Sequence, residues 1–311
     1  YNGDIAKKIT KLGIELPKPI LLPTILLPNE DGSLVATTDS TPIIRRLENE
    51  FTERRIVPND PALAFINYLL EDFGDEWVTK YMFHYRWYFK EDADVAGTIL
   101  PLVDIGINTP NEMHAKYKEF VSKRQIDRLW VVGSNDDTAN FIDLSYKRFL
   151  NLMEEHLLNS SFLLGTKPSS SDFSFYGQLT QLVGFDPTPR KIAYEYSLRT
   201  VAWVDVLDDL SGHDTENTAW TKLEDSPESL KNLLKEVGKM YIPALLSNAQ
   251  ALENGDETWE MKIDNAVWKQ KTFPYQAKCL KWIKNEFDLL NQEDKKRVLD
   301  FLDDTGCETI L

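Results

Sequence analysis

Two kinds of hydrophobic pattern divide the chain. Near the start, short apolar runs within residues 20–28 and 34–37 lie on either side of Asp31-Gly32, a pair typical of a hairpin turn. From residue 61 onward, apolar side chains recur every three or four positions, which indicates amphipathic helices. The pattern therefore predicts an α-dominated α+β chain whose first β element is a small hairpin.

The first apolar run contains a proline, and a helix start follows the second run. Pro23 cannot donate to a strand ladder, so we expect it at an edge, a bulge or a bend, where a cis peptide bond is one alternative. Residues 38–42, Thr-Asp-Ser-Thr-Pro, then precede the apolar Ile43 and Ile44. Asp and Ser cap helices and proline fits a first turn, so a helix is expected to begin there.

The remaining apolar stripes predict a mostly helical chain. The first stripe, which begins at Ala62, indicates one long helix that runs to about Phe89. Further stripes lie within residues 142–157, 173–183, 203–210, 230–241 and 280–290. A kink is expected at Pro243, because proline removes one intrahelical hydrogen bond. Alternating residues from 258 to 263 predict a second hairpin that ends near Trp268, and Asn291 with Asp294 would cap a last helix.

Charge and composition narrow the classes of partner. The 311 residues carry a net charge of −15, which opposes a phosphate backbone, so no nucleic acid partner is expected. No apolar run approaches the roughly 20 residues that span a bilayer, so no membrane insertion is expected. The two cysteines, Cys279 and Cys307, lie in no CxxC pattern, which favours reduced thiols and a cytoplasmic location.

Common catalytic and metal-binding signatures are missing from the sequence. It contains no GxSxG, Walker A, GxGxxG or HExxH motif. Its four histidines, at positions 84, 114, 156 and 213, are scattered along the chain. We therefore expect no metal site, and no catalytic residue is assigned from a motif.

One stretch suggests a ligand. Leu22-Pro23-Thr24-Ile25, the hairpin, and then residues 39–47 (Asp-Ser-Thr-Pro-Ile-Ile-Arg-Arg-Leu) resemble the second half of the thioredoxin-like domain of glutathione transferases. There a Val-Pro-x-Leu strand with a cis proline leads to a Glu/Asp-Ser-x-Ala-Ile-x-x-Tyr-Leu helix. A helix start offers free N–H groups to a carboxylate, Ser40 adds a hydroxyl, and Asp39 could hold an ammonium group. The alternative is that Asp39 and Ser40 only cap the helix.

A second stretch resembles the same family. Residues 167–179 look like the Ser/Thr-x-x-Asp capping box that opens a buried helix in the C-terminal domain of glutathione transferases, with Ser169 at the cap and Asp172 three residues later. The resemblance covers about residues 5–250. It implies a partial thioredoxin-like, glutathione-binding domain over 1–56 and an all-α domain over 61–254. Residues 255–311 would form a C-terminal hairpin and helices packed on the bundle.

The resemblance also implies a function. Glutathione would be the co-substrate, held by Asp39 and Ser40 and by the backbone at Leu22 and Pro23, and a small apolar electrophile would be conjugated or reduced. A homodimer is implied as well. Tyr81, His84, Tyr85 and Arg86 are expected to line the cleft for the second substrate, the alternative being ordinary core for most of this aromatic run.

Two points remain open at this stage. Residues 5–12 match the family's second helix, which leaves its first strand, first helix and second strand without a counterpart before Pro23. An alternative alignment makes residues 1–3 a strand–helix junction. We therefore name no thiol-activating residue. The rival hypothesis is a non-catalytic interaction or scaffold protein that kept the fold and lost the chemistry.

Overall fold

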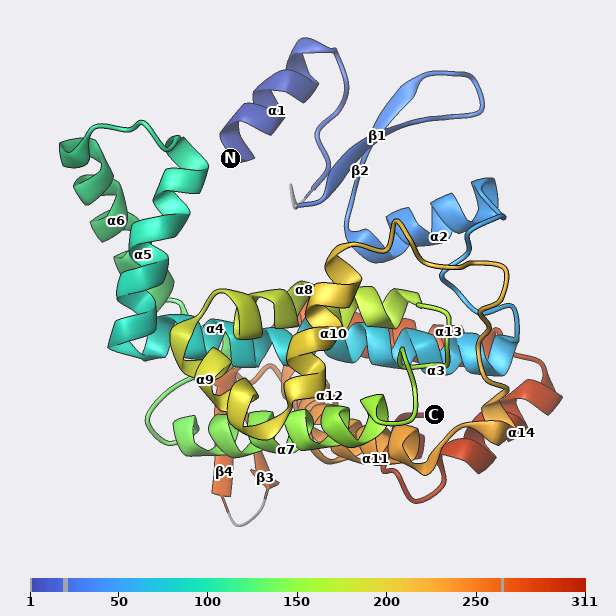
Figure 1. Ribbon diagram of the computed structural model, residues 1–311. Coiled ribbons are helices and arrows are strands. Elements are labelled where there is room, and N and C mark those ends of the chain that lie inside the picture. Colours follow the sequence, from blue (N-terminus) through green and yellow to red (C-terminus); the bar gives the residue numbers. More distant parts are fainter. Residues whose placement is uncertain (1, 19–21, 264–265) are drawn as a thin grey trace. The chain divides into compact units, whose positions relative to one another are not determined.

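A computed structural model describes residues 2–18, 22–263 and 266–311 of the chain (Figure 1). The chain divides into two compact units, residues 1–56 and 57–311. Helices dominate, with two small antiparallel two-stranded sheets, so the expected α-dominated α+β class is confirmed. Predictions that concerned Tyr1, residues 20–21 and the second hairpin turn at 264–265 lie outside the described residues.

The first unit contains the predicted hairpin between two helices. Its elements in order are α1 (Asn2–Lys11), β1 (Thr24–Pro28), β2 (Leu34–Thr38) and α2 (Ser40–Glu50). The strands pair antiparallel, with Thr24 opposite Thr38 and Pro28 opposite Leu34. Gly32 adopts a φ of 80°, which suits glycine in the tight turn. The Leu22–Pro23 peptide bond is cis, as the sequence allowed.

A long interrupted helix runs through the second unit. The predicted helix over 62–89 is present as α3 (Pro61–Phe73), a π-helical turn η1 (Gly74–Val78) and α4 (Thr79–Tyr88). Asp60 caps its start by accepting from Ala62 N at 2.9 Å and Leu63 N at 3.2 Å. In Figure 1 these segments follow one another through the middle of the helical unit, and α8 packs against both α3 and α4.

The other helices confirm most of the sequence predictions. The stripes correspond to α7 (Ala139–Leu157), α8 (Ser170–Gly184), α10 (Leu198–Asp208) and α11 (Glu228–Glu236). After α11, the π-helical turn η4 (Val237–Tyr241) leads into α12 (Ile242–Asn254), and the proline where a kink was expected lies in the first turn of α12. Short 3-10 turns complete the unit at η2 (Leu129–Val132), η3 (Leu223–Asp225) and η5 (Cys307–Ile310).

Three helices were not predicted. α5 (Lys90–Ile105) and α6 (Asn111–Ile126) pack against each other, yet α6 has no buried residue and so shows no apolar stripe. α9 (Pro187–Tyr196) begins in the Asp-Pro-Thr-Pro segment that the sequence suggested as a break. The prolines there fit the first helical turn, where a missing N–H does no harm.

The C-terminal segment is part of the helical unit. It forms the predicted hairpin, β3 (Thr258–Ile263) and β4 (Ala266–Lys271), followed by α13 (Pro274–Asp288) and α14 (Gln292–Leu302). The Trp268 ring centroid lies 5.4 Å from that of Trp77, and Phe287 lies 5.5 Å from Phe65. Residues 255–311 therefore share one hydrophobic core with the bundle and form no separate body.

Membrane insertion was tested on the described helices. Across residues 2–18, 22–263 and 266–311, none combines the length and the apolar character needed to span a bilayer.

Candidate functional site

The candidate glutathione site of the first unit lies where β2 ends and α2 begins. Because Thr24 pairs with Thr38, Pro23 comes beside Asp39, the residue that links strand and helix. The Thr38 hydroxyl donates to the Pro23 carbonyl oxygen at 3.3 Å. The register of the hairpin thus brings the cis-proline segment and the helix start to the same place.

Asp39 combines a capping role with a strained backbone. Its carboxylate accepts from Thr41 N at 3.3 Å, so it caps α2 as the simpler interpretation required. Its φ of 80° lies in the left-handed region, which costs a residue with a side chain about 1–3 kcal/mol. Such strain is retained where neighbouring structure enforces it, and it occurs frequently at ligand sites.

The neighbouring groups offer unused hydrogen-bonding capacity. In the described part of the chain, the Ser40 hydroxyl has no hydrogen-bond partner, and neither has the backbone of Leu22. Asp39 and Ser40 are partly buried, while the Leu22 side chain is half exposed. The four residues that the sequence grouped as glutathione-binding therefore lie together and are open to solvent. Nothing in their geometry identifies a thiol-activating group.

The expected cleft residues of α4 are core residues instead. Tyr81, His84, Tyr85 and Arg86 are at most 7% exposed. Each has a hydrogen-bond partner inside the helical unit, in the pairs Tyr81 with Ser145, His84 Nδ1 with Ser134, Tyr85 with Asp143 and Arg86 with Asp186. His84 Nε2 is buried and has no hydrogen-bond partner among the described residues. The sequence argument held that polar tips rarely fill a core without partners, and here distant helices and loops supply those partners. The expectation that these side chains line a cleft is therefore corrected.

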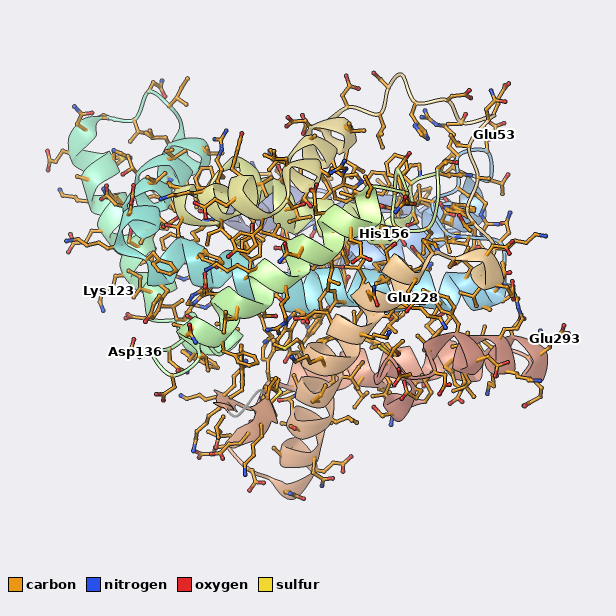
Figure 2. All side chains as sticks on the ribbon, turned by 60° about the horizontal axis from the view of Figure 1, so that its bottom comes forward. Glu53, Lys123, Asp136, His156, Glu228 and Glu293 are labelled. Carbon is orange, nitrogen blue, oxygen red and sulfur yellow. The ribbon has the colours of Figure 1, made fainter. Side chains whose placement is uncertain are left out.

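Burial also settles the charge of two histidines. It lowers the pKa of His84 to about 4 and lowers that of His156, so both rings are neutral at pH 7. His156, labelled in Figure 2, has its Nδ1 3.0 Å from the Ser229 hydroxyl oxygen. Over the described residues, no three His, Cys, Asp or Glu side chains converge as a metal-binding group would.

The capping box predicted at the start of α8 is confirmed. Asp172 accepts from the Ser169 backbone N–H at 2.8 Å and from the Ser169 hydroxyl at 2.6 Å. Its other oxygen accepts from Leu163 N at 2.7 Å, which ties the preceding loop to the helix. The whole box is buried, and its role is structural.

A buried lysine of the helical unit was not singled out from the sequence. Lys80 on α4 is 1% exposed and lines a cavity of about 200 Å³. It follows Trp77 by three positions and so falls on the apolar stripe of the long helix. A charged residue on such a stripe is the signal that would have identified it.

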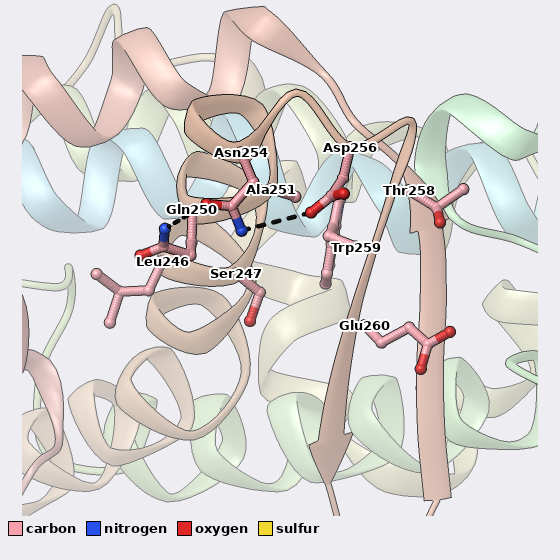
Figure 3. A pocket seen from close by; sticks show the side chains of 9 residues that line it. All are labelled: Leu246, Ser247, Gln250, Ala251, Asn254, Asp256, Thr258, Trp259 and Glu260. Carbon is pink, nitrogen blue, oxygen red and sulfur yellow. Dashed lines mark hydrogen bonds between the residues drawn. The ribbon is translucent and has the colours of Figure 1, made fainter.

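A second hollow lies between α12 and β3 (Figure 3). Gln250 Nε2 donates to Asn254 Oδ1 at 3.1 Å, and Asn254 Nδ2 donates to Asp256 Oδ2 at 3.4 Å, as the dashed lines show. Glu260 at its edge is paired with Lys269 at 2.8 Å. These polar side chains bond to one another, while the buried Nε1 of Trp259, also in the lining, has no partner among the described residues. Both carboxylates in the lining have partners, so the hollow suggests no particular chemistry.

Comparisons with protein-family models, curated proteins and solved structures found no match for this chain.

Proposed function

We propose that this chain is a glutathione transferase-like protein, which binds glutathione through residues 22–40 and conjugates or reduces a small apolar electrophile. The homodimer and the cytoplasmic location implied by the sequence resemblance belong to the same proposal. The observation that carries it is the hairpin register, which sets the cis-proline segment beside the start of α2.

Each part of the tripeptide has a matching group in this segment. The α-carboxylate of the γ-glutamyl end would accept from the Ser40 hydroxyl and the Ser40 backbone N–H at the start of α2. The α-ammonium would pair with the Asp39 carboxylate. The cysteinyl unit would hydrogen-bond to the backbone of Leu22, whose N–H and carbonyl have no partner among the described residues.

The proposed reaction uses the thiolate of the bound tripeptide. A thiolate is the nucleophilic form of a thiol, so the bound sulfur would lose its proton to solvent before it attacks an electrophilic carbon. A carbon–sulfur bond forms as the leaving group departs with the electron pair of its bond. The chain's own contribution on this proposal is to bind and orient the peptide.

Retention on immobilised glutathione tests the binding step. Asp39→Asn removes the charge but keeps a capping oxygen, and Ser40→Ala removes the hydroxyl. We expect each variant to elute earlier and the double variant to pass unretained. Asp31→Asn removes one charge from the hairpin turn of the same unit and is the matched control. Full retention of the double variant would refute the assignment.

A non-catalytic interaction protein is the second candidate. The observation that favours it is a set of exposed apolar side chains on α5, on α6 and on the turn between them, including Val103 at 69%, Ile107 at 88% and Phe120 at 61% exposure. Exposed apolar side chains are typical of protein interaction surfaces where they form a patch.

Turnover separates the two candidates. A chloronitrobenzene electrophile and glutathione, followed by absorbance, would report conjugation. Turnover above the uncatalysed rate that falls in Ser40→Ala supports the transferase. Retention on glutathione without turnover against a panel of electrophiles supports the non-catalytic protein.

A further inference from the structure

The cavity beside Lys80 lies entirely within the second unit. Its lining comes from the π-helical turn η1 and α4, the segment around η2, and the start of α13. The volume of about 200 Å³ corresponds to roughly seven waters at about 30 Å³ each. A molecule of about ten non-hydrogen atoms is therefore the size that fits.

Lys80 brings a poorly compensated positive charge to this cavity. An ammonium group has three N–H donors, yet the described structure gives Lys80 one hydrogen bond, a long one of 3.5 Å to Gln270 Oε1. That oxygen already accepts from Trp268 Nε1 at 3.2 Å. The other nearby contact is the face of Trp77, whose ring centroid is 5.5 Å from Nζ. No ion pair of Lys80 within 4 Å occurs in the described ranges, although the Glu76 carboxylate one turn earlier attracts the ammonium group electrostatically and raises its pKa against the larger effect of burial. A buried cation normally has an anionic partner, because desolvation without one is costly.

A second unsatisfied group faces the same cavity. Gln276, in the first turn of α13, is 3% exposed and lines the cavity. Its Oε1 atom is buried and accepts no hydrogen bond within the described part of the chain. Buried amide oxygens are nearly always bonded, so a donor is missing at this position.

The remaining lining fixes the character of the molecule between these two groups. Phe83, Val132 and Phe273 provide apolar walls. Arg128 is exposed and lines the cavity too, so it marks the side toward solvent. With Glu76 as the one carboxylate on the lining, two cations leave the cavity positive in a chain whose net charge is −15. Such a site favours an anion with an apolar body.

We propose that this cavity binds a small monocarboxylic acid with an apolar body and one hydrogen-bond donor, such as an aromatic or branched 2-hydroxy acid. The carboxylate accepts from the Lys80 ammonium, the hydroxyl donates to Gln276 Oε1, and the body packs on the phenylalanine and valine side chains. This site is independent of the glutathione proposal, since every residue in it belongs to 57–311.

Ligand-observed NMR with the full chain tests the site. The acids used are mandelate, 3-phenyllactate and 2-hydroxy-4-methylpentanoate. Two further probes each lack one polar group: methyl mandelate has no charge and phenylacetate has no hydroxyl. We expect saturable millimolar or tighter binding of at least one hydroxy acid. Phenylacetate should bind several-fold more weakly than mandelate, and methyl mandelate should bind at least tenfold more weakly than mandelate. No saturable binding by any hydroxy acid, or equal binding of acid and ester, would overturn the proposal.

Variants assign the binding to this cavity. Lys80→Met should weaken binding of the hydroxy acid at least tenfold. Gln276→Leu should reduce the affinity for the hydroxy acid to that of the acid without a hydroxyl. Lys116→Met removes an exposed lysine of α6 and should bind as the native chain does. The fold of Lys80→Met is checked by its melting temperature, which should rise because a buried charge is removed. Unchanged affinity in a folded Lys80→Met would place the ligand elsewhere and refute the assignment.

Discussion

Arg86 donates from Nε and Nη2 to both carboxylate oxygens of Asp186, at distances between 2.9 and 3.2 Å, inside the helical core. Asp186 is fully buried, and burial raises the pKa of its carboxyl group while Arg86 opposes that rise. We expect Arg86→Met to destabilise the unit by about 3–5 kcal/mol, because it leaves a buried carboxylate unpaired. Urea unfolding followed by tryptophan fluorescence measures the change.

The double variant Arg86→Met with Asp186→Leu distinguishes the loss of the whole ion pair from the loss of one of its members. It should recover most of the lost stability, since both charges are then absent. Additive losses in the double variant would mean that each residue acts through other contacts.

The stability of the helical unit should depend on both carboxylate oxygens of Asp172. Its two oxygens serve the backbone N–H groups of Ser169 and Leu163, at 2.8 and 2.7 Å. Asn in its place keeps one acceptor, so one buried N–H loses its partner at a cost of about 1–3 kcal/mol. Equilibrium unfolding of Asp172→Asn measures this cost. Asp205→Asn, on the exposed face of α10, is the control and should remain near the native value.

Lys80 should make stability depend on pH in the alkaline range. Burial lowers the pKa of this lysine from 10.5 to about 8. Between these values the unfolded chain holds a proton on this lysine that the folded chain has lost, so the contribution of Lys80 to stability rises with pH across this window. Below pH 8 the buried charge costs about 3 kcal/mol. Buried groups with raised pKa values, such as Tyr81 and Cys307, lower stability over the same range. The Lys80 contribution is therefore the difference in pH dependence between the native chain and Lys80→Met, measured by unfolding at pH 7.5 and at pH 10, and Lys116→Met should behave as the native chain does. An unaltered slope in Lys80→Met would assign the titration to other lysines.

Gly238 tests how the end of the chain joins the bundle. A Cβ on this residue of η4 would lie 2.0 Å from the carbonyl oxygen of Thr305, so Gly238→Ala must displace the C-terminal backbone. We expect the free energy of unfolding to fall by about 1–3 kcal/mol or more, as it does when a core is overpacked. Gly177→Ala in α8 is the control, because a Cβ there meets nothing within 4 Å. It should stabilise the helix by up to about 1 kcal/mol. Thermal unfolding distinguishes the two.

Two substitutions of Asp39 separate the effect of backbone strain on stability from the effect of helix capping. Asp39→Gly and Asp39→Ala both remove the capping carboxylate, but only glycine adopts a φ of 80° without strain. The glycine variant should be more stable than the alanine variant by about 1 kcal/mol. Every tryptophan lies in residues 57–311, so hydrogen exchange of the α2 amides is the suitable measurement. Equal protection in the two variants would show that the backbone there carries no strain.

Local features of the fold were predictable from sequence because local chemistry determines them. The hairpin turn at Asp31-Gly32, the cap at Asp39 and the capping box at Ser169 and Asp172 each depend on residues a few positions apart. Apolar stripes likewise marked α7, α8 and α11, which bury mainly one face, and α3, which is buried on nearly all sides. Helix α6 was missed because it buries no residue, so its formation leaves no apolar stripe in the sequence.

The candidate sites also differ in whether local sequence or helix packing brings their residues together. The sequence by itself determined the grouping of Leu22, Pro23, Asp39 and Ser40, since a short hairpin brings its two ends together. Only the tertiary structure decided that His84, Tyr85 and Arg86 are core residues, because their partners stand 50, 58 and 100 positions away along the chain. It also decided that Lys80 and Gln276, from α4 and α13, face one cavity. Contacts over such separations depend on how helices pack, and no local pattern of residue types encodes them.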